Sequence, residues 1–281
     1  MQRLSTSLAA LALAAVLPAA QAQQGINLTA GPVDYTTWSL FGSAQAANST
    51  PGNGYTYSVL TLTQPGTGDQ AGAAFAPVAL MLDFNQGFRF DFNWYITGAP
   101  DSVRGDGFTF LLSADTALGP GGSDLGYAGV HGASVAMAVD TFHFDGEPVS
   151  PSLQILTGGN TLPIVSIETG LEDSIRNSNG QWFGSLEYTP SGIDDHTGTL
   201  VAGIEHFELG SFSVQATVDF QALGLVDAPV YYGFTASNGL ATDGHATSWG
   251  AAVPVPEPQT WLMLLAGLAA VGWMAHRRRV G

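Results

Sequence analysis

The chain contains no cysteine and no lysine among its 281 residues. Without cysteine, no disulfide can form, so a folded domain must be held together by its own hydrophobic core. All seven basic residues are arginine, and only Arg89, Arg104 and Arg176 lie away from the two ends. Residues 23–255 therefore combine three arginines with 22 carboxylates, a formal net charge of −19. This charge excludes nucleic acid as a partner, because nothing would neutralise its phosphates. It favours a neutral glycan or cations over an anionic polysaccharide.

The sequence also lacks the signals of several enzyme classes. It has no Gly-x-Ser-x-Gly elbow and no histidine spacing typical of a zinc site. The glycine-rich stretch 118–129 lacks the Gly-Lys-Ser/Thr ending of a phosphate loop. No segment shows a sustained helical period. These absences predict a protein that is built from strands and is not an enzyme.

Both ends of the chain carry targeting signals. A basic start at Arg3, an apolar run over 8–18 and small residues at Ala20 and Ala22 predict a secretory signal peptide over 1–22. Near the C-terminus, an uncharged apolar segment at about 260–276 is long enough to span a bilayer. The basic cluster that follows it should stay in the cytoplasm, which places the body of the chain across the membrane. This cluster consists of Arg277, Arg278 and Arg279.

The apolar segment is preceded by Pro256, Glu257 and Pro258. This order of tripeptide, span and arginine cluster resembles the PEP-CTERM sorting tail of surface proteins from Gram-negative bacteria. The resemblance implies export across the inner membrane, anchoring by the span, and processing by an exosortase, with the protein ending at the cell surface or outside the cell. A plain membrane anchor would explain the span and the arginines but not the tripeptide. We expect three parts: the signal peptide, a domain over 23–252 and a sorting tail over 253–281.

The body of the chain has the pattern of a β protein. Alternating or continuous apolar segments are separated by glycine, asparagine, aspartate and proline, which predicts an all-β sandwich. The expected strands cover residues 55–62, 88–95, 107–112, 135–142, 182–188, 198–204, 211–220 and 230–236.

Several segments resemble, in order, those of the L-type (legume-like) lectins. The segments are Ala71–Phe75, Phe88–Tyr95, Gly105–Phe110, Leu125–Tyr127, Val135–Phe142 and Val230–Trp249. The resemblance implies a concanavalin A-like jelly-roll sandwich of two antiparallel sheets. It also implies a sugar site supported by two metal ions.

The resemblance assigns candidate sugar-binding residues. Asp106 matches the aspartate that accepts hydrogen bonds from sugar hydroxyls, although it could instead cap its own turn. Gly122 and Gly126 are both candidates for the glycine that offers a backbone N–H. Phe144 replaces the asparagine that binds calcium and sugar, so its ring either stacks on a pyranose or packs under the loop. Asp243 lies in the loop that tunes sugar choice, or in a plain solvated turn.

The resemblance also assigns candidate calcium ligands. Asp140 matches the aspartate that bridges both metals, and Phe142 matches the position that offers a backbone carbonyl. Glu147 corresponds to the second aspartate, and Asp145 lies between these residues. Calcium takes six to eight oxygen ligands, so water would complete such a site. The alternative is that 145–148 is only an acidic turn.

Other positions depart from the family pattern. Ala138 stands where the family has a glutamate, and Ser152 stands near its metal-binding histidine. We therefore expect no transition metal. Laminarinase-like hydrolases share this sandwich but need paired glutamates on the same strand, and these are also missing here.

Two functions follow from these residues. The first is an exported lectin-like protein that binds a neutral glycan or exopolysaccharide, which Asp106 and the glycine-rich loop favour. The alternative is a structural or matrix protein of the surface that retains the lectin scaffold without its site. Ala138, Phe144 and Ser152 favour this alternative. Fold alone does not decide between them.

Overall fold

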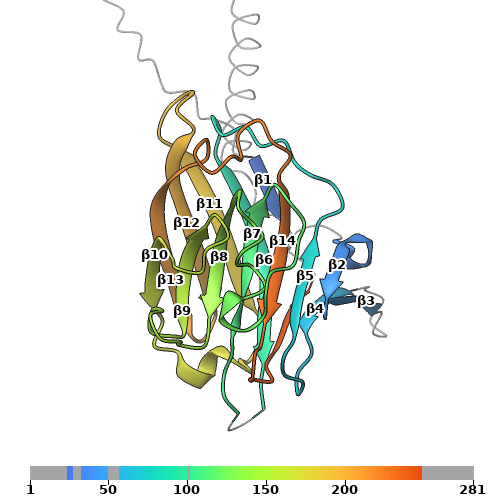
Figure 1. The fold of residues 1–281 in the computed structure, drawn as a ribbon. Helices are drawn as coiled ribbons and strands as arrows, with labels where there is room; N and C mark the ends of the chain where they lie inside the picture. Colours follow the sequence, from blue (N-terminus) through green and yellow to red (C-terminus); the bar gives the residue numbers. More distant parts are fainter. Residues whose placement is uncertain (1–23, 28–32, 50–56, 100–101, 249–281) are drawn as a thin grey trace, which may run out of the picture.

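The computed structural model describes residues 24–27, 33–49, 57–99 and 102–248. Two β-sheets pack face to face, and the only helices among these residues are short 3-10 turns (Figure 1). The all-β sandwich expected from the sequence is confirmed. No helix in these described ranges is long and apolar enough to cross a membrane. The signal peptide over 1–22 and the span at 260–276 lie outside the described residues.

One sheet has eight strands and is antiparallel except where β1 runs parallel to β6. Its spatial order is β13 (Gly210–Asp219), β12 (Thr197–His206), β11 (Trp182–Pro190), β6 (Phe88–Thr97), β15 (Gly244–Ser248), β4 (Tyr57–Thr63) and β3 (Gln45–Ser49), with β1 (Gln24–Asn27) beside β6.

The other sheet has seven antiparallel strands. Its spatial order is β10 (Val165–Glu168), β9 (Ser152–Thr157), β8 (Ser134–Asp140), β7 (Gly107–Ser113), β14 (Tyr231–Ser237), β5 (Ala71–Phe75) and β2 (Ser39–Gly42). The 3-10 turns are η1 (Tyr35–Thr37), η2 (Gly122–Asp124) and η3 (Glu172–Ile175).

Aromatic side chains fill the space between the sheets. Phe92 of β6 stacks on Phe110 of β7, with ring centroids 4.6 Å apart, and Trp94 stacks on Trp182 at 5.3 Å. These four side chains are almost fully buried. Burying a large apolar side chain contributes about 1.5–3 kcal/mol. The aromatic core thus supplies the cohesion that a chain without disulfides needs.

A third layer covers the outer face of the seven-stranded sheet. Leu125 and Tyr127, from the loop between β7 and β8, pack on Ala136 and Ala138 of β8. The Tyr127 hydroxyl also bonds Ser134 Oγ at 2.7 Å. This layer explains why every residue of β7 and β8 is buried, whereas strands covered on one side alternate.

Three neighbouring strands, β8, β7 and β14, have chain ends that lie side by side at one end of this sheet. Gly107, the first residue of β7, pairs with Ser237 at the end of β14 and with Asp140 at the end of β8. A Cβ at Gly107 would lie 2.2 Å from the Val139 carbonyl oxygen, so only glycine allows this close approach. The expected strand 135–142 ends instead at Asp140, because the Asp140 carboxylate accepts a hydrogen bond from the Phe142 amide and turns the chain. Asp106 and Asp140 are thereby brought to the same end of the sheet.

Candidate functional site

A cleft of about 740 Å³ opens at the end of the sheet where the ends of β7, β8 and β14 lie side by side. Its lining includes Asp106, Gly122, Phe142 and Phe144, which come from three separate segments of the sequence. Clefts of roughly 300–1,000 Å³ are typical of small-molecule sites. The cleft therefore has the size of a ligand site, and it contains several of the residues singled out from the sequence.

Asp106 is the buried acid of this cleft, with only 7% of its surface exposed. Its amide donates to the Ser237 carbonyl at 3.0 Å and its carbonyl accepts from the Thr141 amide at 2.8 Å. The Gly105–Asp106 peptide bond is cis. Among the described residues, no group bonds its carboxylate oxygen Oδ2. A buried acceptor without a donor is unusual, and a ligand hydroxyl would satisfy it.

Burial raises the pKa of Asp106 to about 6, and the negative charges of Glu147 and Asp243 add to this effect. Whatever Oδ1 does in the turn, Oδ2 has no partner in the described chain. The carboxylate is therefore available to an incoming hydrogen-bond donor.

The two candidate glycines occupy different environments. Gly122 lines the cleft, and its carbonyl accepts from Ser237 Oγ at 2.6 Å. Gly126 is not among the lining residues, and its amide donates to the Pro120 carbonyl at 2.9 Å. The structure thus brings Gly122 to Asp106 and leaves Gly126 within the loop.

A further glycine, Gly239, was not singled out from the sequence. It lines the cleft, and a Cβ at this position would lie 2.6 Å from Asp106 Oδ2. Its φ of +41° also disfavours other residues. Gly239 therefore keeps the space beside the Asp106 carboxylate free. Its place next to Asn238 in the loop after β14 gave no local signal of this contact.

The rim of the cleft is apolar. Phe144 is 59% exposed, Val103 is 61% exposed and Leu240 is 95% exposed. Phe144 is therefore not packed beneath its loop, which was one of the two expectations for it. Exposed apolar side chains around a hollow favour a ligand with an apolar face.

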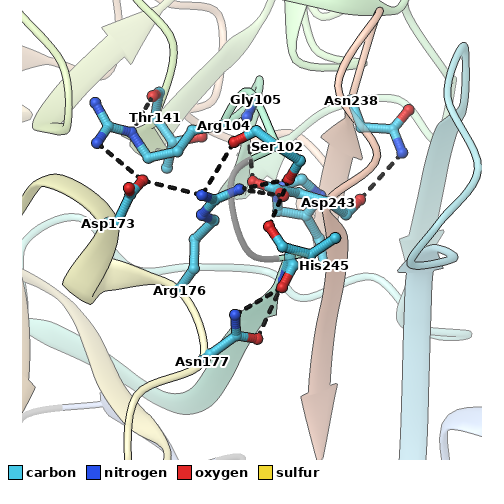
Figure 2. A network of polar contacts seen from close by, with 12 residues as sticks. Ser102, Arg104, Gly105, Thr141, Asp173, Arg176, Asn177, Asn238, Asp243 and His245 are labelled. Atoms are coloured by element: carbon cyan, nitrogen blue, oxygen red, sulfur yellow. Dashed lines mark hydrogen bonds and ion pairs between the residues drawn. The ribbon is translucent and has the colours of Figure 1, made fainter.

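Asp243 lies outside the lining of the cleft and is fully buried. Its Oδ1 accepts from Arg176 Nη1 at 3.0 Å, and its Oδ2 accepts from the Gly105 amide at 3.2 Å (Figure 2). Burial raises its pKa, while the Gly105 amide and Arg176 oppose that effect. Both carboxylate oxygens of Asp243 accept hydrogen bonds from the chain, and its side chain is fully buried. This geometry does not match a solvated turn, and it gives no support to a direct sugar contact.

Asp140 is buried, and each of its carboxylate oxygens accepts a hydrogen bond from the chain. Oδ1 accepts from the Phe142 amide at 3.1 Å and Oδ2 accepts from Gln154 Nε2 at 3.0 Å. The Gln154 amide also donates to Ser152 Oγ at 2.8 Å. In the sheet register Gln154 lies opposite Ala138, and Ser152 lies opposite Asp140. The amide of Gln154 therefore bonds among the positions to which the resemblance assigned the transition metal.

Asp140, Asp145 and Glu147 do not form an acidic cluster that could hold a metal ion in the described part of the chain. The Glu147 carboxylate accepts from the Phe144 amide at 2.9 Å, and Asp145 is exposed. The negative charge of Glu147 raises the pKa of Asp140, to about 7, in addition to the larger effect of burial. Within the described part of the chain, no group of three or more acidic, histidine or cysteine side chains could hold a metal ion. The residues present do not fit a site of six to eight oxygens.

Two of the three arginines of the body belong to a polar network with Asp173 and Asp243 (Figure 2), and one of them, Arg104, also lines the cleft. Arg176 bridges Asp243 and Asp173, both at 3.0 Å. Arg104 bonds the Thr141 carbonyl at 3.3 Å and Glu172 at 3.0 Å. Sequence reasoning missed both residues. The scarcity of arginine in the body was the one signal that could have found them.

The C-terminal tail and the folded body are similar to different known proteins. Residues 254–279 match the PEP-CTERM protein-sorting motif, so the chain carries this sorting tail. No curated protein sequence matches the chain.

Solved structures similar to this one are legume lectins. The basic winged bean lectin with Tn-antigen is 20% identical, with a TM-score of 0.59 over 76% of this chain and 92% of that chain. The metal-free form of lectin I-B4 from Griffonia simplicifolia is 18% identical, with a TM-score of 0.59 and the same coverage. The Bauhinia forficata lectin in complex with GalNAc is 17% identical, with a TM-score of 0.56 over 76% of this chain and 100% of that chain. The body therefore has the legume-lectin fold.

Proposed function

We propose that this chain, which joins a legume-lectin fold to a PEP-CTERM sorting tail, is an exported protein that binds carbohydrate without catalysis. The observation that carries the proposal is the buried Asp106 carboxylate, whose Oδ2 has no partner among the described residues and which lines a cleft of about 740 Å³. A carboxylate accepts charge-assisted hydrogen bonds from hydroxyl groups in a fixed geometry, which suits a sugar.

The proposed ligand is a neutral glycan or exopolysaccharide. The chain carries a formal net charge of −16, which would repel an anionic polymer. Asp106 accepts from sugar hydroxyls beside Gly122, and the exposed ring of Phe144 packs on the apolar C–H face of a pyranose. The Bauhinia forficata lectin of similar fold was solved with GalNAc, a neutral sugar.

We propose that the protein has no hydrolytic activity. Retaining glycosidases need two carboxylates about 5–5.5 Å apart. On β8, Asp140 is preceded two residues earlier by Ala138, and Ala138 pairs with Gln154 on β9. The neighbouring positions on this face of the two strands thus lack the second carboxylate.

Its place in the cell follows from its tail. We propose removal of the signal peptide 1–22, a lectin-like domain over 23–252, and export across the inner membrane of a Gram-negative bacterium. The tail 253–281 then anchors the protein until an exosortase acts near Pro256–Pro258, which leaves the protein at the cell surface or in the extracellular matrix. The sorting motif at 254–279 supports this sequence of events.

A structural role in the surface matrix is the second candidate. One observation favours it: the edge strand β10 and the loop before it expose Leu162, Ile164 and Ile167. An exposed apolar edge is prone to pair with another chain. In this case the lectin scaffold would serve self-association rather than sugar binding.

A glycan array probed with the full-length protein in detergent tests the first proposal. We expect binding to a set of neutral glycans, and loss of that binding in Asp106→Ala. Asp195→Ala is the matched control, because Asp195 is an exposed aspartate between β11 and β12 and lies outside the cleft lining. The absence of binding to every glycan would overturn the proposal and favour the structural role. Equal binding by Asp106→Ala would place the sugar elsewhere.

A further inference from the structure

We infer that the cleft is held in its binding shape by two ties made by the chain itself, so that it binds its glycan without a metal ion. The first tie is the buried ion pair between Arg176 and Asp243, and the second is the bond from the Gln154 amide to Asp140. Both act as positioning devices for Asp106. The inference rests on the proposed function, and it adds that the site is independent of metal.

The ion pair fixes the segment that leads into Asp106. Arg176 donates from Nη1 to Ser102 Oγ at 3.1 Å and from Nη2 to the Ser102 carbonyl at 3.2 Å. Asp243 accepts from the Gly105 amide, immediately before Asp106, at 3.2 Å. Arg176 and Asp243 also bond each other at 3.0 Å. The ion pair is therefore hydrogen-bonded to both ends of the 102–105 segment (Figure 2).

This pair is built into the interior. The side chains of Arg176 and Asp243 are 4% and 0% exposed. A Cβ at Gly98 would lie 2.4 Å from Asp243 Oδ1 and 2.7 Å from Arg176 Nη1, so the chain leaves space for the pair. A buried ion pair contributes little net stability over an apolar pair, because desolvation offsets the attraction. Its benefit here is the fixed geometry of the loop that carries Asp106.

The second tie fixes the other side of the cleft. The Asp106 carbonyl accepts from the Thr141 amide, so Asp106 is joined directly to the end of β8. That end is held by Asp140, whose two oxygens accept from the Phe142 amide and the Gln154 side chain. A metal ion at Asp140 would have to bind oxygens that already accept hydrogen bonds from these two donors. The Gln154 amide thus serves as a neutral, permanent replacement for a cation at this position.

The first experiment measures the thermal midpoint of the full-length protein and its affinity for an array-positive glycan, in EDTA and then with added calcium or manganese. We expect the midpoint to agree within about a degree and the affinity within about twofold in all three conditions, because nothing that binds the folded state has been removed or added. A midpoint several degrees higher with either metal, or glycan binding that EDTA abolishes, would overturn the inference.

The thermal measurement needs no glycan, so its result stands even where no glycan binds. An unchanged midpoint with no glycan bound would reject the proposed function while supporting the metal-free ties. A metal-dependent midpoint together with glycan binding would support the proposed function and reject the metal-free ties.

Variants test the two ties separately. Asp243→Asn is nearly isosteric, and we expect it to lower glycan affinity at least tenfold and to speed amide hydrogen exchange at Gly105, while Asp243→Glu restores part of the affinity. Unchanged affinity and exchange in Asp243→Asn would contradict a positioning role for the pair.

Gln154→Glu places a carboxylate beside Asp140. We expect this variant to gain a thermal midpoint that rises with calcium or manganese, because the cation would relieve two adjacent negative charges. Gln215→Glu is the matched control, since Gln215 is exposed on β13. The thermal midpoint of this control variant should not change when calcium or manganese is added. A Gln154→Glu midpoint that is insensitive to both metals, in a protein that folds, would contradict the second tie.

Discussion

Asp106 and Asp140 are two buried aspartates at the same end of one sheet, and they differ in their hydrogen bonds to the rest of the chain. Both are less than a tenth exposed, and burial and the nearby Glu147 raise the pKa of both. Asp140 accepts hydrogen bonds from the chain on both oxygens, whereas Asp106 Oδ2 has no partner among the described residues. Equal burial therefore does not imply an equal role. The paired carboxylate bonds the end of β8, and we propose that the unpaired one accepts from a ligand.

Removing each carboxylate should separate these roles and gives the largest expected effects. Asp140→Ala removes the side-chain acceptor of the Phe142 amide and one of the two acceptors of the buried Gln154 side chain, so we expect the free energy of unfolding to fall by about 2–4 kcal/mol. Asp106→Ala removes a carboxylate whose Oδ2 bonds nothing in the described chain, so we expect a change below about 1 kcal/mol. Urea denaturation followed by circular dichroism measures both.

Glycan affinity should show the opposite ranking. We expect Asp106→Ala to weaken binding by about 100-fold, since hydrogen bonds to a charged group contribute about 1.5–3 kcal/mol each. Asp106→Asn keeps the shape but removes the charge, and it should recover only part of this loss. Equal destabilisation by Asp106→Ala and Asp140→Ala would show that both carboxylates serve the fold.

A second prediction concerns the pH dependence of binding. The pKa of Asp106 is about 6, so its ionised fraction rises about tenfold from about pH 5 to about pH 7. We expect glycan affinity to rise by about the same factor over this range, because only the carboxylate accepts from two hydroxyls at once. Isothermal titration calorimetry measures this change, and the affinity of Asp106→Asn should stay nearly constant.

Stability should respond to pH with the opposite sign. Folding raises the pKa of Asp106 and Asp140 from 3.8 to about 6 and about 7. Each acid therefore contributes stability that is fully present below its unfolded pKa and is lost as pH rises through its folded pKa. We expect these two groups to lower the free energy of unfolding from about pH 4 to about pH 7, between their unfolded and folded pKa values. A smaller decline in Asp106→Asn would assign part of the effect to Asp106.

Much of the fold could be predicted from the sequence, because the alternating and continuous apolar segments are local patterns. The continuous run at 107–112 indicated a strand buried on both faces, and β7 is such a strand. The end of β8 was harder to predict, since a side chain stops the strand at Asp140 and periodicity does not record that bond.

The site was predicted less completely, for a physical reason. The position of Asp106 follows from its own segment, Gly105–Phe110, but the pairs that hold it are distant in sequence. Arg176 meets Asp243 across 67 residues, and Gln154 meets Asp140 across 14. The sequence around Asp243 and the sequence around Arg176 do not indicate that the two side chains form an ion pair in the interior. Asp243 was therefore assigned to the sugar, when its oxygens bond Arg176 and Gly105.

The smallest expected effect concerns the rim of the cleft. Phe144 is 59% exposed beside Asp106, and its ring would cover the apolar face of a bound pyranose. Aromatic contacts of this kind contribute about 0.5–1.5 kcal/mol beyond area burial, so we expect Phe144→Ala to weaken glycan binding about three- to tenfold with little change in stability. Phe183→Ala is the matched control, because Phe183 is 51% exposed on β11 and is absent from the cleft lining.

Calorimetry on the two phenylalanine variants distinguishes a stacking ring from a bystander. A loss of affinity in Phe144→Ala that Phe144→Tyr restores would identify the ring itself as the contact, since tyrosine keeps the aromatic face. Equal affinities for Phe144→Ala and Phe183→Ala would leave Asp106 as the sole determinant at the cleft. The apolar rim would then serve another contact, and the difference between Asp106 and Asp140 would rest on hydrogen bonding alone.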